Sequence, residues 1–205
     1  MIKETAATFE ARDLPFLWVI DPGTKPPDLA ARLKAYGYGP DPHGEEAAVM
    51  VLPIDATIEA PTVAGLELHD ALADSATFTA ADTAAAEAFL SVHLDDDPDR
   101  LAMLERRRVD AVASGNRRLL LATVHGEPAG SASLALYPPR GAMINGGSVR
   151  PKFRGRGVYR ALVAARLEMA RKAGVAGLVV QAGAMSKPIL DRLGFKPVSW
   201  RRFYV

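Results

Sequence analysis

Apolar residues near the start of the chain form short runs that are separated by polar turns. Residues 16–21 are aromatic and β-branched, which is typical of a buried strand, and Pro22-Gly23 ends the run. A helix is expected from Asp28, with apolar positions at helical spacing and a stop at Gly37. Residues 47–52 predict a second strand. The resulting strand–helix–strand unit buries too little apolar surface to stand alone.

The pattern restarts after residues 54–62, which read as a linker or as a strand leading into the next domain. The expected order is a strand, two helices, three antiparallel strands, a long helix, a strand, a short helix and a last strand. The ranges are 65–68, 79–90, 98 onwards, 118–124, 129–136, 142–149, 157–172, 178–181, 186–193 and 198–205. This order predicts a mixed α/β (α+β) layer fold. We divide the chain into an N-terminal unit, 1–58, and a main domain, 59–205.

The N-terminal unit has a counterpart near the other end of the chain. Residues 17–20, a helix and Gly37-Tyr38 follow the same order as residues 178–181, a helix and Gly194-Phe195. We interpret the N-terminal unit as a degenerate copy of the C-terminal half of the main domain, although any strand–helix–strand unit has this outline.

Composition excludes several classes of protein. The 205 residues include no Cys, so disulfides, thiol nucleophiles and thiolate metal sites are ruled out. The four His residues have no metal-binding spacing, and we expect no metal. No apolar run is long enough for a membrane span, and the first residues do not resemble a signal peptide, so we expect a cytoplasmic protein without a membrane partner.

The net charge of +1 conceals a strong asymmetry. Residues 1–100 hold 6 Lys/Arg and 19 Asp/Glu, whereas residues 101–205 hold 19 Lys/Arg and 5 Asp/Glu. The two halves therefore carry −13 and +14, and either they neutralise each other or the basic half meets an anion.

One stretch, 148–162, concentrates basic residues and glycine between a strand and a helix. Unpaired N–H groups and the positive end of a helix dipole meet at such a turn, which favours phosphate. Gly155 and Gly157 permit close approach of an anion, and Lys152, Arg154, Arg156 and Arg160 supply charge. A Walker loop and a complete Rossmann fingerprint are both absent from the sequence.

The stretch resembles the acyl-CoA loop of the GNAT superfamily of N-acyltransferases, whose pattern is Gln/Arg-x-x-Gly-x-Gly/Ala. Residues 152–157 fit it, with Lys152 at the first position. Val149-x-Pro151 precedes it, Leu162 follows it, and Leu193-Gly194-Phe195 matches the ending of the family's next helix. The resemblance covers about residues 63–205, and residues 1–55 look like the partial, cofactor-free repeat of tandem members.

This resemblance implies the acyl-CoA N-acyltransferase (GNAT) fold, with a V-shaped opening between two strands. It implies acetyl-CoA as cosubstrate, direct attack of an amine on the thioester, and an oxyanion stabilised by a backbone N–H near Val149. The backbone of Val149 should pair with the pantetheine, and Arg154 to Tyr159 should wrap the pyrophosphate. The expected cofactor-binding residues are Val149, Lys152, Arg154, Gly155, Arg156, Gly157, Val158, Tyr159 and Arg160.

Two positions depart from the family pattern. Leu190 stands where many members have a Tyr general acid, and Gly183 stands where an Asn is usual. Ser186, Tyr159 or a water could replace the acid. No general base stands out, because His125 and Glu127 fall on a hairpin tip, where solvated turn residues are the default, so the catalytic residues stay unknown.

The expected acceptor is a small-molecule or peptide amine. Asp95-Asp96-Asp97 could form an acidic rim for it, but helix capping together with a solvated loop is the favoured explanation of these residues. The alternative function is an inactive or weak acyl-CoA-binding sensor or partner module. Nucleic-acid binding is disfavoured, because the basic residues concentrate on one glycine loop. The acceptor, the acyl length and the oligomeric state stay open, with a homodimer as one option.

Overall fold

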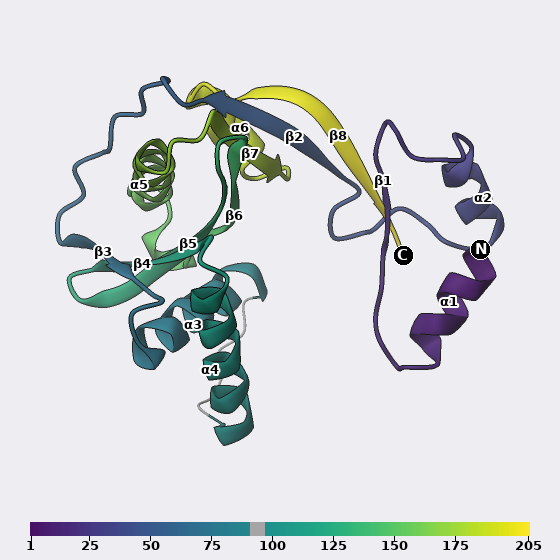
Figure 1. Ribbon diagram of the computed structural model, residues 1–205, viewed down its shortest axis with the longest axis horizontal. Helices are drawn as coiled ribbons and strands as arrows, with labels where there is room; N and C mark the ends of the chain where they lie inside the picture. The colour runs from purple at the N-terminus through teal and green to yellow at the C-terminus, as the bar shows by residue number, and fades with distance from the viewer. Residues whose placement is uncertain (91–96) are drawn as a thin grey trace. The chain divides into compact units, whose positions relative to one another are not determined.

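The computed structural model describes residues 1–90 and 97–205 and divides them into two compact units (Figure 1). The first unit combines residues 1–51 with residues 181–205, and the second consists of residues 52–180. The first unit is therefore built from both ends of the chain. Our division of the sequence at residue 58 stays a prediction.

The first unit is organised around the last strand of the chain. Its elements are α1(Ile2–Glu10), β1(Trp18–Ile20), α2(Leu29–Ala35), β2(Glu46–Pro53), α6(Lys187–Arg192) and β8(Lys196–Tyr204). Strand β8 pairs antiparallel with β1 on one side, through Val19 and Phe203, and with β2 on the other, through Ala48 and Trp200. Both N-terminal strands thus form ladder hydrogen bonds with the C-terminal strand.

Helices α2 and α6 end in the same way. Gly37 has a φ of 91° and Gly194 a φ of 92°, the left-handed conformation that glycine adopts without strain. Tyr38 N–H donates to the carbonyl of Leu33, and Phe195 N–H donates to that of Leu190 in the same position. The similarity expected between these two segments therefore extends to the hydrogen bonds of their helix ends.

The second unit is a twisted sheet with helices on both faces. Its elements are β3(Leu66–Asp70), α3(Ser75–Leu90), α4(Pro98–Ala113), β4(Arg117–Val124), β5(Glu127–Tyr137), β6(Gly141–Val149), the 3₁₀ turn η1(Pro151–Phe153), α5(Val158–Lys172) and β7(Gly177–Ala182). The strands lie in the order β7-β6-β5-β4-β3, with β7 parallel to β6 and the other pairs antiparallel. The mixed α/β class and the element order expected from the sequence are confirmed.

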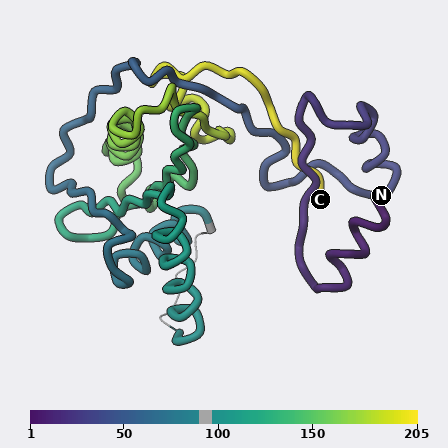
Figure 2. The backbone as a smooth tube through the Cα atoms, viewed as in Figure 1, coloured from purple at the N-terminus to yellow at the C-terminus, as the bar shows by residue number. Residues whose placement is uncertain are grey.

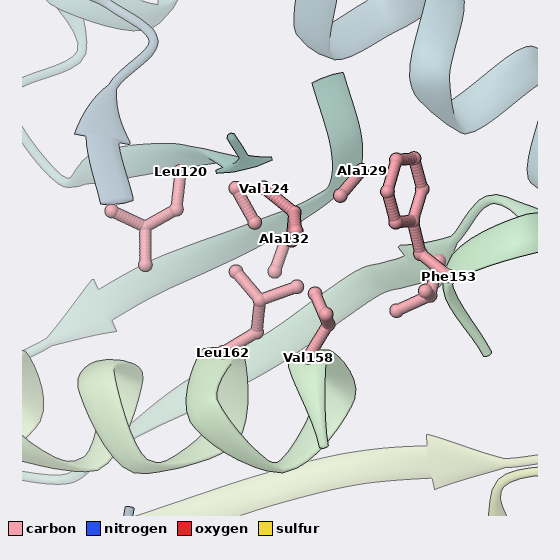
Figure 3. Packing of buried hydrophobic residues seen from close by; sticks show 9 residues of the cluster. Leu120, Val124, Ala129, Ala132, Phe153, Val158 and Leu162 are labelled. Atoms are coloured by element: carbon pink, nitrogen blue, oxygen red, sulfur yellow. The ribbon is translucent and has the colours of Figure 1, made fainter. Parts of the chain in front are cut away.

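Alternation along β4 sorts its side chains between two cores. Leu120 and Val124 pack with Val158 and Leu162 of α5 on one face, as Figure 3 shows. Leu121 points to the other face and packs with Ala71 and Ala81. The α5 face also includes Phe153, which anchors the loop after β6 in the core. The loop after β6 is therefore attached to a packed layer on its inner side.

Two helix predictions need correction. Helix α3 begins at Ser75 rather than at residue 79, because the Asp74 side chain accepts hydrogen bonds from the N–H and hydroxyl of Thr77. Helix α1 was not predicted, although Ile2, Ala6 and Phe9 have helical spacing, and Ile2 and Ala6 are buried.

Residues 54–63 run alongside α5, and we call this segment the strap (Figure 2). Arg171, near the end of the helix, donates hydrogen bonds to the carbonyls of Ile54 and Ala56. Pro61 and Val63 lie against Gly157, at the start of the helix. The linker expected at residues 54–62 thus lies along α5, the helix that follows the glycine-rich loop.

Candidate functional site

Strands β6 and β7 are paired only at their beginnings. The parallel ladder joins Ala142 to Leu178 and Met143 to Val179. Strand β6 continues to Val149, six residues beyond the last of these pairs in the described part of the chain. This short ladder is compatible with the strand separation that the family resemblance implies at Val149.

The loop after β6 brings backbone N–H groups to the start of α5. Gly155 and Gly157 have φ values of 74° and 89°, in the left-handed region. Gly157 is the N-cap of α5, so the N–H groups of Val158, Tyr159 and Arg160 begin the helix without acceptors in the preceding turn. A Cβ at Gly155 would meet nothing within 4 Å, so this side of the loop is open. Such a turn can accept a phosphate.

The first cations of the loop are engaged by carboxylates of the same chain. Arg150 Nε donates to Glu87 at 2.5 Å and its Nη1 donates to Glu127 at 3.2 Å. Lys152 also donates to Glu127. The hydrogen bond from Lys152, together with the charges of both cations, lowers the pKa of Glu127. Lys152, an expected cofactor ligand, is therefore partly neutralised by Glu127.

Arg154 is used within the fold. Its Nε donates to the carbonyl of Val149 at 3.1 Å, and its Nη2 donates to the carbonyl of Ala88 at 3.0 Å. The side chain thus ties the loop to the end of β6 and to α3. Its predicted role toward the pyrophosphate stays a prediction, and these contacts show that it has a structural role as well.

Arg156 and Arg160 are the exposed cations at the start of α5. The Arg156 guanidinium lies 5.6 Å from the centre of the Phe153 ring. Arg160 faces Glu59 of the strap at 3.9 Å, and the Glu59 side chain is 89% exposed. Contacts of this kind are weak in water, so both guanidinium groups remain available to an anionic ligand.

A second feature of the site, which the sequence reasoning missed, lies on β6. Ser131 pairs with Ser148, and Ser133 pairs with Asn145, so Ala132 of β5 stands opposite both Gly146 and Gly147. We call this two-residue segment, Gly146–Gly147, the β6 bulge. Such bulges leave an extra residue outside the ladder and are frequent next to active sites.

Arg166 of α5 lies beneath the β6 bulge and is 1% exposed. Its Nη1 donates to the carbonyls of Ser133 at 3.2 Å and Asn145 at 3.3 Å, and its Nε donates to that of Leu162. Within the described residues, no carboxylate forms a salt bridge with Arg166 and its Nη2 has no partner. Burial lowers the pKa of Arg166 to about 10.

Tyr159 lies on the same side of the β6 bulge as Arg166. A Cβ placed on Gly147 would be 2.9 Å from Tyr159 Cε2 and 3.2 Å from Arg166 Nη2. Burial raises the pKa of the Tyr159 phenol, and the nearby Arg166 opposes this effect. The phenol therefore keeps its proton at neutral pH.

The departures from the family pattern are explained locally. Leu190 is fully buried, and its carbonyl accepts the hydrogen bond that ends α6. The Ser186 hydroxyl donates to the carbonyl of Gly183 at 3.3 Å. Leu190 thus occupies a packing position, equivalent to that of Leu33 at the end of α2.

The other residues that the sequence suggested, for a general base or for an acidic rim, lie in turns, form ion pairs or helix caps, or fall outside the described residues. His125 occupies a turn with a φ of 51°, and Glu127 is paired with Lys152. Asp97 caps α4 by accepting from the N–H groups of Asp99 and Arg100. Asp95 and Asp96 lie outside the described residues.

Neither a metal site nor a membrane-spanning helix is found in the described ranges. Residues 1–90 and 97–205 contain no cluster of three or more His, Asp or Glu that could hold a metal ion. In the same ranges, each helix is too short or too polar to cross a bilayer.

Comparison with models of protein families shows to which family the chain belongs. The sequence model of the Acetyltransferase (GNAT) family matches residues 78–195, more than half of the chain. The chain belongs to this GNAT family. The match begins within α3, ends at the residue before β8 and includes the whole glycine loop of this GNAT protein. No curated protein matches the sequence.

Solved structures share the fold of this GNAT protein at low sequence identity. A GCN5-related N-acetyltransferase from Kribbella flavida has a TM-score of 0.70 at 15% identity, with 99% of this chain and 72% of that chain covered. A tandem GNAT protein from the clavulanic acid biosynthesis pathway has a TM-score of 0.68 at 18% identity, with 98% and 66% covered. A predicted acetyltransferase from Clostridium acetobutylicum, solved with acetyl-CoA, has a TM-score of 0.52 at 15% identity, with 65% and 91% covered. The GNAT fold expected from the sequence is confirmed.

Proposed function

We propose that this GNAT protein transfers an acetyl group from acetyl-CoA to an amine by direct attack of the amine on the thioester. Membership of the GNAT family supports acyl transfer from acetyl-CoA in general. The observation that carries the proposal is the loop with left-handed Gly155 and Gly157 at the start of α5, flanked by the exposed Arg156 and Arg160.

The residues present fit the phosphate groups of CoA. The N–H groups of Val158 to Arg160 would donate to the pyrophosphate, and the two exposed guanidinium groups would add charge. The open space beside Gly155 leaves room for oxygen atoms close to the backbone. Lys152 and Arg154 contribute less in this assignment, because carboxylate and carbonyl groups already hold them.

Acetyl-CoA supplies an activated acyl group as a thioester. In the reaction a C–N bond forms, the C–S bond breaks, the amine loses a proton and CoA leaves as a thiolate. This protein's contribution is to hold both reactants together and to place a backbone N–H of β6 near the thioester oxygen, where negative charge develops. Because a bulge leaves its extra residue outside the ladder, the β6 bulge is the place on β6 where we expect such an N–H.

Tyr159 is the side chain whose protonation suits a proton donor to the thiolate. Its phenol has an ordinary pKa of 10.0, which burial raises further, so the proton is present at neutral pH. Replacement of Tyr159 by Phe should slow turnover while acetyl-CoA still binds. Unchanged turnover in this variant would show that a water or another group supplies the proton.

A turnover experiment tests the function. Wild-type protein, acetyl-CoA and a panel of small and peptide amines are incubated with a thiol reagent that reports free CoA, and calorimetry measures acetyl-CoA binding in parallel. Amine-dependent CoA release supports the proposal. Absence of both release and binding would overturn it.

A second candidate, an acyl-CoA-binding sensor without turnover, is favoured by one observation. Leu190, at the usual position of the acid, is buried and serves as a packing residue at the end of α6. This candidate predicts that CoA raises the thermal unfolding temperature, whereas no amine in the panel releases CoA.

A further inference from the structure

Arg166 is an unusual residue for its place in the fold. It lies on the inward face of α5 with Leu162 and Val163, among apolar side chains, and is 1% exposed. A buried cation is normally paired with a carboxylate, because removal from water is costly. Arg166 instead meets carbonyl oxygens, and one of its nitrogens, Nη2, has no partner in the described part of the chain.

The carbonyls that Arg166 contacts flank the β6 bulge. Ser133 and Asn145 are the registered pair on one side of the bulge, and both of their carbonyls accept from Nη1. The Ser133 hydroxyl also donates to the carbonyl of Asn145 at 3.2 Å. The guanidinium therefore supplies donors to backbone oxygens where the regular ladder is interrupted.

The glycines of the bulge make room for this arrangement. A Cβ at Gly147 would be 3.2 Å from Arg166 Nη2 and 2.9 Å from the Tyr159 ring, closer than side chains normally approach. Gly146 has a φ of 54°, which a residue with a Cβ rarely adopts. The guanidinium of Arg166 thus occupies space that is available only because residue 147 is a glycine, and the backbone conformation of residue 146 also favours glycine.

We propose that Arg166 is a positioning residue for acyl transfer, which holds the β6 bulge in place through the carbonyls of Ser133 and Asn145. With the bulge held, a backbone N–H of Gly146 or Gly147 stays outside the ladder and donates to the thioester oxygen. The fixed charge of Arg166 beneath the strand strengthens that donation. The inference rests on the proposed function and adds a residue to it.

The test measures the carbonyl of bound acetyl-CoA by infrared spectroscopy, with ¹³C at the thioester carbon. Hydrogen bonding to this oxygen lowers its stretching frequency, and the measurement needs no amine. The wild type should lower the frequency relative to free acetyl-CoA. Arg166→Met should return the frequency toward the value of free acetyl-CoA. Arg166→Lys keeps the positive charge but lacks the planar guanidinium group, so its frequency should lie between those of the wild type and Arg166→Met.

Arg171→Met is the matched control. Arg171 is on the same helix and also donates to backbone carbonyls, but those carbonyls belong to the strap. This variant should keep the wild-type frequency. Both Met variants should bind acetyl-CoA within about threefold of the wild type, because neither Arg166 nor Arg171 lies in the glycine loop to which we assign the phosphates.

Turnover provides a second measurement with any amine that the wild type accepts. Arg166→Met should lower kcat about tenfold or more with KM for acetyl-CoA nearly unchanged, since the lost effect acts on the developing charge. A purely structural role would instead alter stability and KM together.

The outcomes separate the two proposals. If the wild type does not bind acetyl-CoA, the proposed function fails and this inference fails with it. If the wild type binds acetyl-CoA but the Arg166→Met protein has the wild-type frequency and kcat, only the inference is overturned. If Arg166→Met does not fold, Arg166→Lys and Gly147→Ala, which crowds Nη2, decide: a wild-type frequency in both overturns the inference.

Discussion

The loop between β6 and α5 has two halves with similar charge and different surroundings. In the first half, residues 150–154, the cations meet their own chain: Arg150 pairs with Glu87 and Glu127, Lys152 with Glu127, and Arg154 with backbone carbonyls. In the second half, residues 155–160, Arg156 and Arg160 are exposed beside the N–H groups that begin α5. The first half fixes the loop, and the second half is left for a ligand.

This difference teaches that a count of cations overstates the charge available to a ligand. Two acidic side chains from α3 and from the start of β5 neutralise part of the basic cluster. The four predictions below test the division between the halves, beginning with the largest expected effect.

Gly157→Ala should affect stability and binding together. Its φ of 89° strains any residue with a Cβ, and the new methyl would lie 3.0 Å from Pro61. We expect a loss of about 2 kcal/mol in the free energy of unfolding and at least about a tenfold loss of CoA affinity. Denaturant unfolding and calorimetry measure the two quantities. Gly174→Ala, with a φ of 66° and open space around it, controls for strain and should keep wild-type affinity.

Glu87→Gln should affect stability much more than binding. Arg150 is 17% exposed and would lose the nearer of its two carboxylate partners, so we expect the free energy of unfolding to fall by about 1–2 kcal/mol. CoA affinity should change less than about threefold, because Arg150 belongs to the first half. A large loss of affinity with unchanged stability would show that the first half binds the ligand directly.

Arg156→Gln and Arg160→Gln should show the reverse pattern. Each should weaken CoA binding about three- to tenfold, with a larger effect at low ionic strength. The free energy of unfolding should stay within about 0.5 kcal/mol of the wild type, because both side chains are exposed. Arg106→Gln, on the exposed side of α4, is the control for a simple loss of surface charge. Equal binding losses in all three variants would remove the distinction between the halves.

The smallest effect concerns pH. The pKa of Glu127 is lower in the folded state than the ordinary 4.5, so its contribution to stability is present above that value and disappears as the pH falls through the folded pKa. The stability difference between wild type and Glu127→Gln should therefore be constant near neutral pH and should shrink in acid. Denaturant unfolding between pH 7 and about pH 3 measures it. A difference that grows in acid would contradict the assigned direction.

The local parts of this structure were predictable from the sequence. The element order, the glycine loop and the start of α5 follow from periodicity, caps and turn residues. The neutralisation of Arg150 was not predictable, because Glu87 is 63 positions away and Glu127 is 23 positions away. Pairings at such separation depend on the register of the strands and the packing of α3, which local patterns do not encode.

Arg166 was not among the site residues predicted from the sequence, and the reason differs from that for Arg150. Its position, four residues after Leu162 and one before Leu167, places it on the buried face of α5. A charged residue at such a position was a visible exception to the apolar pattern. What the sequence could not show was its partners, because the β6 bulge becomes evident only from the register of β5 and β6.

The central place of β8 in the first unit has a consequence for synthesis on the ribosome. Strands β1 and β2 are made first, but both hydrogen-bond to β8, which follows roughly 140 residues after β2. At about 5–20 residues per second, the N-terminal strands wait on the order of 10 s for their partner, whereas most of the second unit can fold meanwhile. Release of a chain that stops before β8 would leave two strand edges open to other chains, so such truncated products should aggregate or be degraded.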